Sequence, residues 1–230
     1  GGHPVQGQTG QRCFSETGFC IEGRIREYWE QNGGLSVFGL PLGPQQTETI
    51  EGKQLQVQRF ERNRLEIHPE NARPYDVLLG RLGADRLAQQ GRDWQQFAKV
   101  GGAPAGCLYF AETGHSVCEP FLSAFRANGL ELDGRRGKTL AESIGLFGLP
   151  LSEPQVETLS DGKNYTVQWF ERARFESHPE NAPPYNVLLG LLGLPLLVIV
   201  AVTREPGRAG PVQSGGSYLQ TLRYLHANRA

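Results

Sequence analysis

Two segments of the chain combine residue types suited to binding sugars, carboxylates or a peptide backbone. Residues 58–83 and 168–193 each contain Phe-Glu-Arg, a second Arg, a second Glu and a His that precedes Pro-Glu-Asn. If the motif runs as one strand, alternation places the Phe, both Arg, the second Glu and the His on one face. These side chains are Phe60, Arg62, Arg64, Glu66 and His68 in the first segment and Phe170, Arg172, Arg174, Glu176 and His178 in the second.

This polar face predicts a binding surface, because guanidinium forks and an aromatic platform suit sugars, carboxylates or a partner's backbone. The opposite face is mostly apolar, so we expect it to meet the core. A structural role fits the same residues: Arg and Glu would pair with each other, and the His would cap the Pro-Glu-Asn turn. Both segments keep these residues, and a structural network explains that as readily as a ligand does.

The same residues do not predict catalysis. Glycosidases need two opposed carboxylates, and the candidates are Glu61 with Glu66 and Glu171 with Glu176. The members of each pair are five positions apart, so on a strand they point to opposite faces. Neither Gly-x-Ser-x-Gly nor a Cys/His signature is present, and a single His per segment offers too few ligands to predict a metal site. We therefore expect a non-catalytic protein without metal or cofactor.

The composition excludes further classes. The 230 residues have a formal net charge of −1, so nucleic-acid binding is not expected. The most apolar stretch, Val187 to Val202, contains Gly and Pro and is shorter than the ~20 residues of a membrane span, so membrane association is not expected. Methionine is absent, even at position 1. A removed signal peptide would explain that, as would trimming of the chain.

The two segments belong to a longer internal repeat. Nineteen of the 26 aligned positions are identical, and the match extends upstream to Glu16-Thr17-Gly18 against Glu112-Thr113-Gly114. The second copy has a 13-residue insertion near Glu131–Ser143. We expect this insertion to be a surface loop.

The repeat predicts an α+β fold of two tandem compact modules, each a helix packed on a small antiparallel sheet with hairpins. The chain then divides into five regions: an N-terminal tail (1–11), module 1 (12–83), a helical linker with a Gly/Pro hinge (84–105), module 2 (106–193) and a C-terminal extension (194–230). Within the linker, Ala84 to Val100 reads as a polar helix. In the extension, Leu196–Val202 reads as β-like, and Tyr218, Leu222 and Leu225 suggest a short helix.

Each module begins with apolar residues at helical spacing: Ile21, Ile25, Tyr28 and Trp29 in the first, and Val117, Phe121 and Phe125 in the second. Asn-Gly would end each helix. Two strands are expected next, with hairpin turns at Glu51-Gly52-Lys53 and Asp161-Gly162-Lys163. The second strand would run through the whole Phe-Glu-Arg-x-Arg-x-Glu motif to His-Pro. A short helix-like Val-Leu-Leu-Gly-x-Leu-Gly would close the module.

The four cysteines predict the disulfides Cys13–Cys20 and Cys107–Cys118. Paired residues in an antiparallel hairpin keep a constant summed residue number. Near the cysteines the second copy follows the first by 96 residues, as Glu16 and Glu112 show. Adding 96 to each of 13 and 20 gives residue numbers that sum to 225, which is also the sum of 107 and 118. Each disulfide would contribute roughly 2–3 kcal/mol and indicates an oxidising compartment. Zinc ligation and free thiols are the alternatives; the chain has no Cys-x-x-Cys spacing.

One part of each repeat resembles the LGFP-type repeat of bacterial cell-envelope proteins. In the second copy the residues concerned are Phe147-Gly148-Leu149-Pro150-Leu151, Glu157, Asp161-Gly162-Lys163 and Phe170. After the Phe the chain departs from that pattern, continuing with Glu-Arg-x-Arg-x-Glu. The resemblance implies envelope association and a non-catalytic role such as polysaccharide or peptidoglycan binding.

These observations predict an extracellular or cell-surface module that binds cell-wall or other envelope polysaccharide, with two sites raising avidity. One alternative is a structural subunit of a surface layer or filament that assembles with copies of itself through Leu196–Val202. Another is the accessory region of a cell-wall hydrolase.

Overall fold

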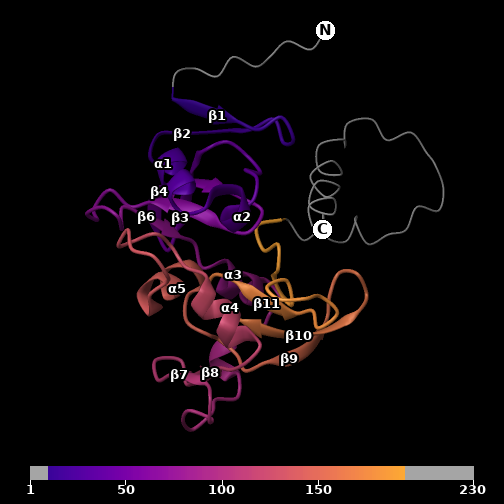
Figure 1. Ribbon diagram of the computed structural model, residues 1–230. Helices are drawn as coiled ribbons and strands as arrows, with labels where there is room; N and C mark the ends of the chain where they lie inside the picture. Colours follow the sequence, from indigo (N-terminus) through magenta and orange to yellow (C-terminus); the bar gives the residue numbers. More distant parts are fainter. Residues whose placement is uncertain (1–9, 195–230) are drawn as a thin grey trace, which may run out of the picture.

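The computed structural model describes residues 10–194, which form a mixed helix-and-sheet structure (Figure 1). This part of the chain contains four small antiparallel sheets, two of two strands and two of four strands. A two-stranded hairpin, helices and a four-stranded sheet follow one another twice in the same order. We call residues 12–83 the first copy and residues 106–193 the second copy.

The first copy begins with a hairpin and ends with a four-stranded sheet in the order β3-β4-β5-β6. Its elements are β1 (Gln11–Cys13), β2 (Cys20–Glu22), α1 (Gly23–Gln31), α2 (Gly34–Phe38), β3 (Gln46–Ile50), β4 (Lys53–Arg59), β5 (Arg64–Ile67) and β6 (Val77–Leu79). Helix α3 (Leu82–Gln89) and a 3-10 turn, η1 (Trp94–Gln96), lead to the second copy.

The second copy repeats this order, with a sheet ordered β12-β11-β10-β9. Its elements are β7 (Leu108–Phe110), β8 (His115–Val117), α4 (Phe121–Ala127), α5 (Leu140–Phe147), β9 (Gln155–Thr158), β10 (Asn164–Trp169), β11 (Arg174–Ser177) and β12 (Val187–Leu189). In Figure 1 the first copy lies above the second.

The Phe-Glu-Arg-x-Arg-x-Glu motif is not one strand, so that prediction is wrong. The chain reverses within it: β4 ends at Arg59 and β5 begins opposite, at Arg64, and the second copy reverses between Trp169 and Arg174. We call residues 60–63 and 170–173 the Phe-Glu-Arg turns. Each is closed by the Phe N–H, which donates to the carbonyl of the fourth residue at 2.8 Å. No Gly or Pro marks either turn, so turn chemistry could not reveal it.

The closing segment also differs from its prediction. Val77–Leu79 and Val187–Leu189 are strands that pair with β5 and β11, not helical turns. Short apolar runs of this length carry no decisive periodicity, and the open edge of the neighbouring strand determines the outcome. In the first copy helix α3 follows, beginning at Leu82, whereas in the second copy the described residues end at Leu194.

The predicted helical faces are present with one change. Helix α1 buries Ile25, Tyr28 and Trp29, and α4 buries Phe121 and Phe125. The first apolar residue of each pattern, Ile21 or Val117, lies in the preceding strand. Asn32 and Asn128 are the C-cap residues of α1 and α4.

The insertion in the second copy is only partly a loop. Its last residues form the first turn of α5, which begins with a capping box between Thr139 and Glu142. The side chain of Glu142 is buried, and hydrogen bonds from the backbone N–H groups of Thr139 and Leu132 lower its pKa to about 2. The insertion therefore extends a packed helix, which corrects the prediction of a loop alone.

The linker helix is shorter than predicted. Helix α3 ends at Gln89, and Gly91, at φ +70°, lies beyond it. Leu196–Val202 and the terminal helix lie outside the described residues, as does most of the N-terminal tail. None of the helices within 10–194 is long and apolar enough to cross a membrane.

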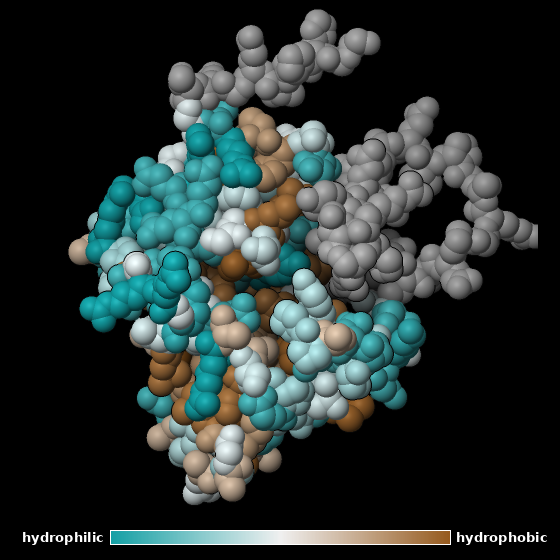
Figure 2. All heavy atoms as spheres, viewed as in Figure 1, coloured by the Kyte–Doolittle hydropathy of each residue, from teal (hydrophilic) through white to brown (hydrophobic). Residues whose placement is uncertain are grey.

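The two copies share one apolar core. A single cluster of buried side chains includes Phe38 and Phe60 of the first copy and Phe125, Phe170 and Phe175 of the second. Rings within it lie close together, with Phe125 stacked on Phe170 at 5.6 Å between centroids. Figure 2 shows hydrophobic residues near the level where the copies meet, while hydrophilic residues cover much of the first copy. Each large apolar side chain buried here stabilises the fold by roughly 1.5–3 kcal/mol.

Both predicted disulfides are present. Cys13 lies opposite Cys20 in the β1–β2 hairpin. The equivalent pair in the second copy is Tyr109 with Ser116, and Cys107–Cys118 lies two residues outward along the same register. Two disulfides fit a secreted or extracellular protein.

A buried glutamine fixes each disulfide hairpin to its sheet. The side-chain amide of Gln58 donates to the carbonyls of Cys20 and Gly43, at 2.9 Å each. Gln168 repeats this at 2.8 Å with Ser116 and Ser152. The hairpins are therefore held as part of the packed structure.

Candidate functional site

The aromatic residues of the predicted binding face are buried. Phe60 and Phe170 are both 0% exposed, inside the shared core. Each forms a bridge to the proline of the Gly-Leu-Pro segment, Pro41 or Pro150. They offer no ring face to a ligand, and the predicted aromatic platform is absent from these positions.

The Phe-Glu-Arg turns and the Gly-Leu-Pro segments hold each other in place. The side-chain carboxylate of Glu61 accepts the N–H of Leu40 at 3.0 Å, and Glu171 accepts that of Leu149 at 3.1 Å. Burial raises the pKa of Glu61, although this hydrogen bond and the nearby Arg62 oppose the effect. The Gly-Leu-Pro and Phe-Glu motifs are thus two sides of one packing contact.

The turn arginines bind backbone carbonyls. Arg172 donates from Nη1 to the carbonyl of Ile144 at 3.2 Å and from Nε to that of Leu79, in the other copy, at 3.0 Å. Burial lowers the pKa of Arg172. Arg62 donates to the carbonyl of Leu35, which is equivalent to Ile144, at 3.4 Å. These two predicted ligand-binding residues therefore tie the turns to their surroundings.

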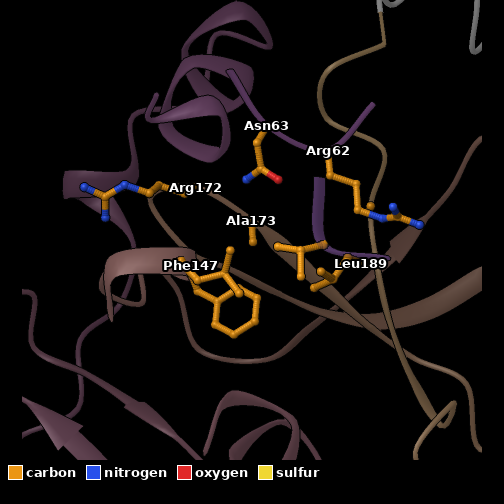
Figure 3. A pocket seen from close by; sticks show the side chains of 9 residues that line it. Arg62, Asn63, Phe147, Arg172, Ala173 and Leu189 are labelled. Atoms are coloured by element: carbon orange, nitrogen blue, oxygen red, sulfur yellow. The ribbon is translucent and has the colours of Figure 1, made fainter. Parts of the chain in front are cut away.

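A small cavity lies between the two turns (Figure 3). Phe147, Ala173 and Leu189 line it, and the guanidinium groups of Arg62 and Arg172 point away from each other. Its volume is about 10 Å³, which holds roughly one water molecule. A small-molecule site of the usual size, about 300 Å³ or more, does not fit here.

The other residues of the predicted binding face in the first copy, Arg64, Glu66 and His68, bind one another. Arg64 donates from Nε to Glu66 Oε1 at 2.7 Å and from Nη1 to Asp85 Oδ2 at 3.1 Å. His68 lies 3.4 Å from Glu66 through Nε2 and 3.2 Å from Glu70 through Nδ1. Arg64 and Glu66 are buried, so this chain of charges faces the protein more than solvent.

The second copy has the same series of paired polar side chains, with one different partner. Arg174 donates to Glu176 Oε1 at 3.1 Å and 2.6 Å. His178 lies 2.9 Å from Glu180 through Nδ1. The guanidinium of Arg174 lies 5.2 Å from the centroid of the Trp169 ring, whereas in the first copy Arg64 contacts Asp85. In both copies the Arg and Glu groups satisfy each other, and no open polar face remains on the strand.

The chain of charges leads to two exposed loops, residues 68–76 and 178–186, which we call the tyrosine loops. Tyr75 is 55% exposed and Tyr185 is 66% exposed. Asn71 fixes the first loop: its N–H donates to the carbonyl of His68 at 3.0 Å, and its side chain donates to that of Tyr75 at 3.1 Å. Asn181 makes the same two bonds in the second loop, at 3.0 and 3.2 Å. Each loop therefore presents an aromatic ring from a defined backbone.

The tyrosine loops have diverged less than part of the core. Seven of their nine positions are identical in the two copies, including both tyrosines. By contrast, the fully buried Leu65 of β5 is Phe175 in β11. Loops normally vary more than the elements they connect, so a retained exposed loop favours a functional role.

The two loops differ in charge. In the first, Asp76 accepts Arg24 at 2.7 and 2.9 Å, and the exposed Arg73 lies 3.2 Å from Glu27. The second loop has Pro183 and Asn186 at the positions of Arg73 and Asp76. The shared parts are the tyrosine, the asparagine and the His-Glu pair, so these define the candidate site.

The binding face predicted from the sequence did not include Tyr75 and Tyr185, although the sequence contains a signal for them. Both copies retain Pro-Tyr in a polar segment, where an aromatic ring has no obvious core to join. Within residues 10–194, no three His, Cys, Asp or Glu side chains gather as metal ligands.

No family model, curated protein or solved structure matches the chain. The repeat, the burial pattern and the tyrosine loops therefore carry the functional argument.

Proposed function

We propose that this chain is a non-catalytic extracellular or cell-surface protein that binds cell-wall or other envelope polysaccharide through its two tyrosine loops. The observation that carries the proposal is the exposed tyrosine retained in both copies. A tyrosine ring has an apolar face that can lie against a sugar ring and a hydroxyl that can hydrogen-bond. Glu70 and Glu180 lie in the same loops with about half of each side chain exposed, and their carboxylates can accept hydrogen bonds from sugar hydroxyls.

Two further features support this assignment. The two disulfides fit export. The resemblance of the Gly-Leu-Pro and Asp-Gly segments to LGFP-type repeats supports the cell envelope as the location. We also propose that the copies act as tandem modules, each contributing one loop, so that a polymer engaging both loops is bound with avidity.

The binding test is retention on purified, insoluble cell wall, with Tyr75→Ala, Tyr185→Ala and the double variant compared with the parent. Loss of one aromatic contact of ~0.5–1.5 kcal/mol weakens binding roughly two- to tenfold. The double variant is expected to lose more than either single variant, because avidity is lost as well.

Val156→Ala is the matched control, since Val156 is 70% exposed and lies outside both loops. It should be retained like the parent. A double tyrosine variant retained as well as the parent would remove the loops as the site. Parent protein that stays in the supernatant would remove the polysaccharide proposal itself.

A further inference from the structure

Each copy ends in a Gly-x-Leu-Gly segment, residues 80–83 or 190–193, that docks on the Phe-Glu-Arg turn of the other copy. The N–H of Gly83 donates to the carbonyl of Glu171 at 2.9 Å, and the N–H of Gly193 donates to that of Glu61 at 3.0 Å. The contact is therefore reciprocal.

Only glycine fits at either docking point. A Cβ on Gly83 would lie 1.9 Å from the carbonyl oxygen of Phe170, and a Cβ on Gly193 would lie 1.8 Å from that of Phe60. Both obstacles are backbone atoms, which cannot rotate away as a side chain can. This close approach explains why both copies retain the glycine.

Arginines strengthen this reciprocal contact from both sides. Arg172 of the second copy donates to Leu79, next to the first Gly-x-Leu-Gly segment. In the other direction, Arg86 of α3 donates to the carbonyls of Leu192 and Leu194, at 2.9 and 2.7 Å. Arg86 is buried, so these bonds satisfy donors that water does not reach.

The chain after the first copy covers the second copy further. Leu82 and Leu87 of α3 join a buried cluster with Val167 and Trp169 of β10. Arg92 forms an ion pair with Glu157 at 2.8 Å. Figure 1 shows α3 in the lower part of the molecule, among elements of the second copy.

We infer that the binding partner of each repeat is the other repeat, and that the two form an exchanged pair whose association does not depend on the covalent link between them. The groups at the docking points are identical in both copies: Phe60 and Phe170, Glu61 and Glu171, Arg62 and Arg172, Leu79 and Leu189, Gly83 and Gly193. Each copy thus carries both halves of a self-complementary contact, as in a two-fold dimer. This inference is independent of the proposed function.

The test cuts the folded, full-length protein between the copies. A recognition sequence for a site-specific protease is inserted between Gly102 and Ala103, in a segment exposed at most positions. Neither disulfide crosses this point, so the cut halves have no covalent connection. We expect the cut protein to elute as one particle with the mass of the uncut chain and to separate only in denaturant. Halves that separate in native buffer at micromolar concentration overturn the inference.

Two variants of the cut protein locate the contact. Gly193→Ala should weaken the association of the halves at least tenfold, because the added methyl group meets the Phe60 carbonyl. Gly43→Ala is the matched control, since its Cβ would meet nothing within 4 Å. Equal association of the two variants would contradict the docking role of Gly193.

Arg86→Gln provides a second test that adds no bulk. It should also weaken the halves' association, and association equal to that of the cut parent would count against the exchange. Near-UV circular dichroism of the uncut variants shows that each is folded before cutting. If a variant does not fold, the cut parent still decides the main question.

Discussion

The Phe-Glu-Arg turns and the tyrosine loops are neighbours in the same repeat, and both are retained in the second copy, but their environments are opposite. The turns are enclosed between the two copies, with Phe60 and Phe170 at 0% exposure. The loops project a tyrosine that is more than half exposed in each copy. Residues retained between two copies can therefore serve packing in one place and, as we propose, ligand binding a few positions away.

The largest expected effect separates the two regions by stability. Phe170→Ala should lower the free energy of unfolding by about 3–5 kcal/mol, because it empties space in the shared core. Tyr185→Ala should change it by less than about 0.5 kcal/mol, because the ring is mainly in solvent. Denaturant titration with the disulfides intact measures both. Similar losses for the two variants would break the distinction between turn and loop.

A smaller effect tests the charges that connect the regions. Arg64→Ala leaves Glu66 buried without its main partner and should cost about 2–4 kcal/mol of stability. Arg73→Ala removes an exposed arginine from the tyrosine loop and should cost less than about 1 kcal/mol. The same denaturant titration compares the two variants. An unchanged free energy of unfolding for Arg64→Ala would show that Arg64, Glu66 and His68 do not form a structural network.

The smallest effect is a difference in pH dependence between two glutamates. Burial raises the pKa of Glu61 in the turn, so the folded state binds this proton more tightly than the unfolded state does. Stability linked to Glu61 is therefore greatest at low pH and falls as pH rises above the unfolded pKa of about 4.5. In the loop, the pKa of Glu70 is lowered by a hydrogen bond from the backbone N–H of Glu70 and then by His68. The stability linked to Glu70 is therefore present at neutral pH and is lost as pH falls below the unfolded pKa of about 4.5.

Gln substitutions test these opposite slopes. Relative to the parent, Glu61→Gln should be neutral or stabilising at pH 7 and should lose that advantage at pH 4 and below. Glu70→Gln should be slightly destabilising at pH 7, and its deficit should shrink in acid. Unfolding free energies measured across this pH range decide the signs, and slopes of the same sign would contradict the assignment of environments.

Much of the local structure was predictable from sequence, because it depends on short-range periodicity. The helical faces around Tyr28 and Phe121 and the register of the disulfide hairpins follow from spacing alone. The reversal at Phe60 and Phe170 was not predictable in this way, since neither turn contains Gly or Pro and the apolar Phe reads as a strand residue. The candidate site therefore differs from the prediction: it lies in the loops with Tyr75 and Tyr185, not on a strand face with Arg62 and Arg172.

The sequence alone shows which residues its two similar segments share, and it predicted the cysteine pairs that the structure contains. Which of those residues are enclosed and which are exposed depends on the tertiary fold. Gly83 and Gly193 illustrate the reason: in sequence they resemble ordinary loop glycines, but each accommodates a backbone carbonyl of the other copy. Identity between copies records that a residue is needed, whereas its burial depends on contacts with chain segments about a hundred residues away, which no local pattern encodes.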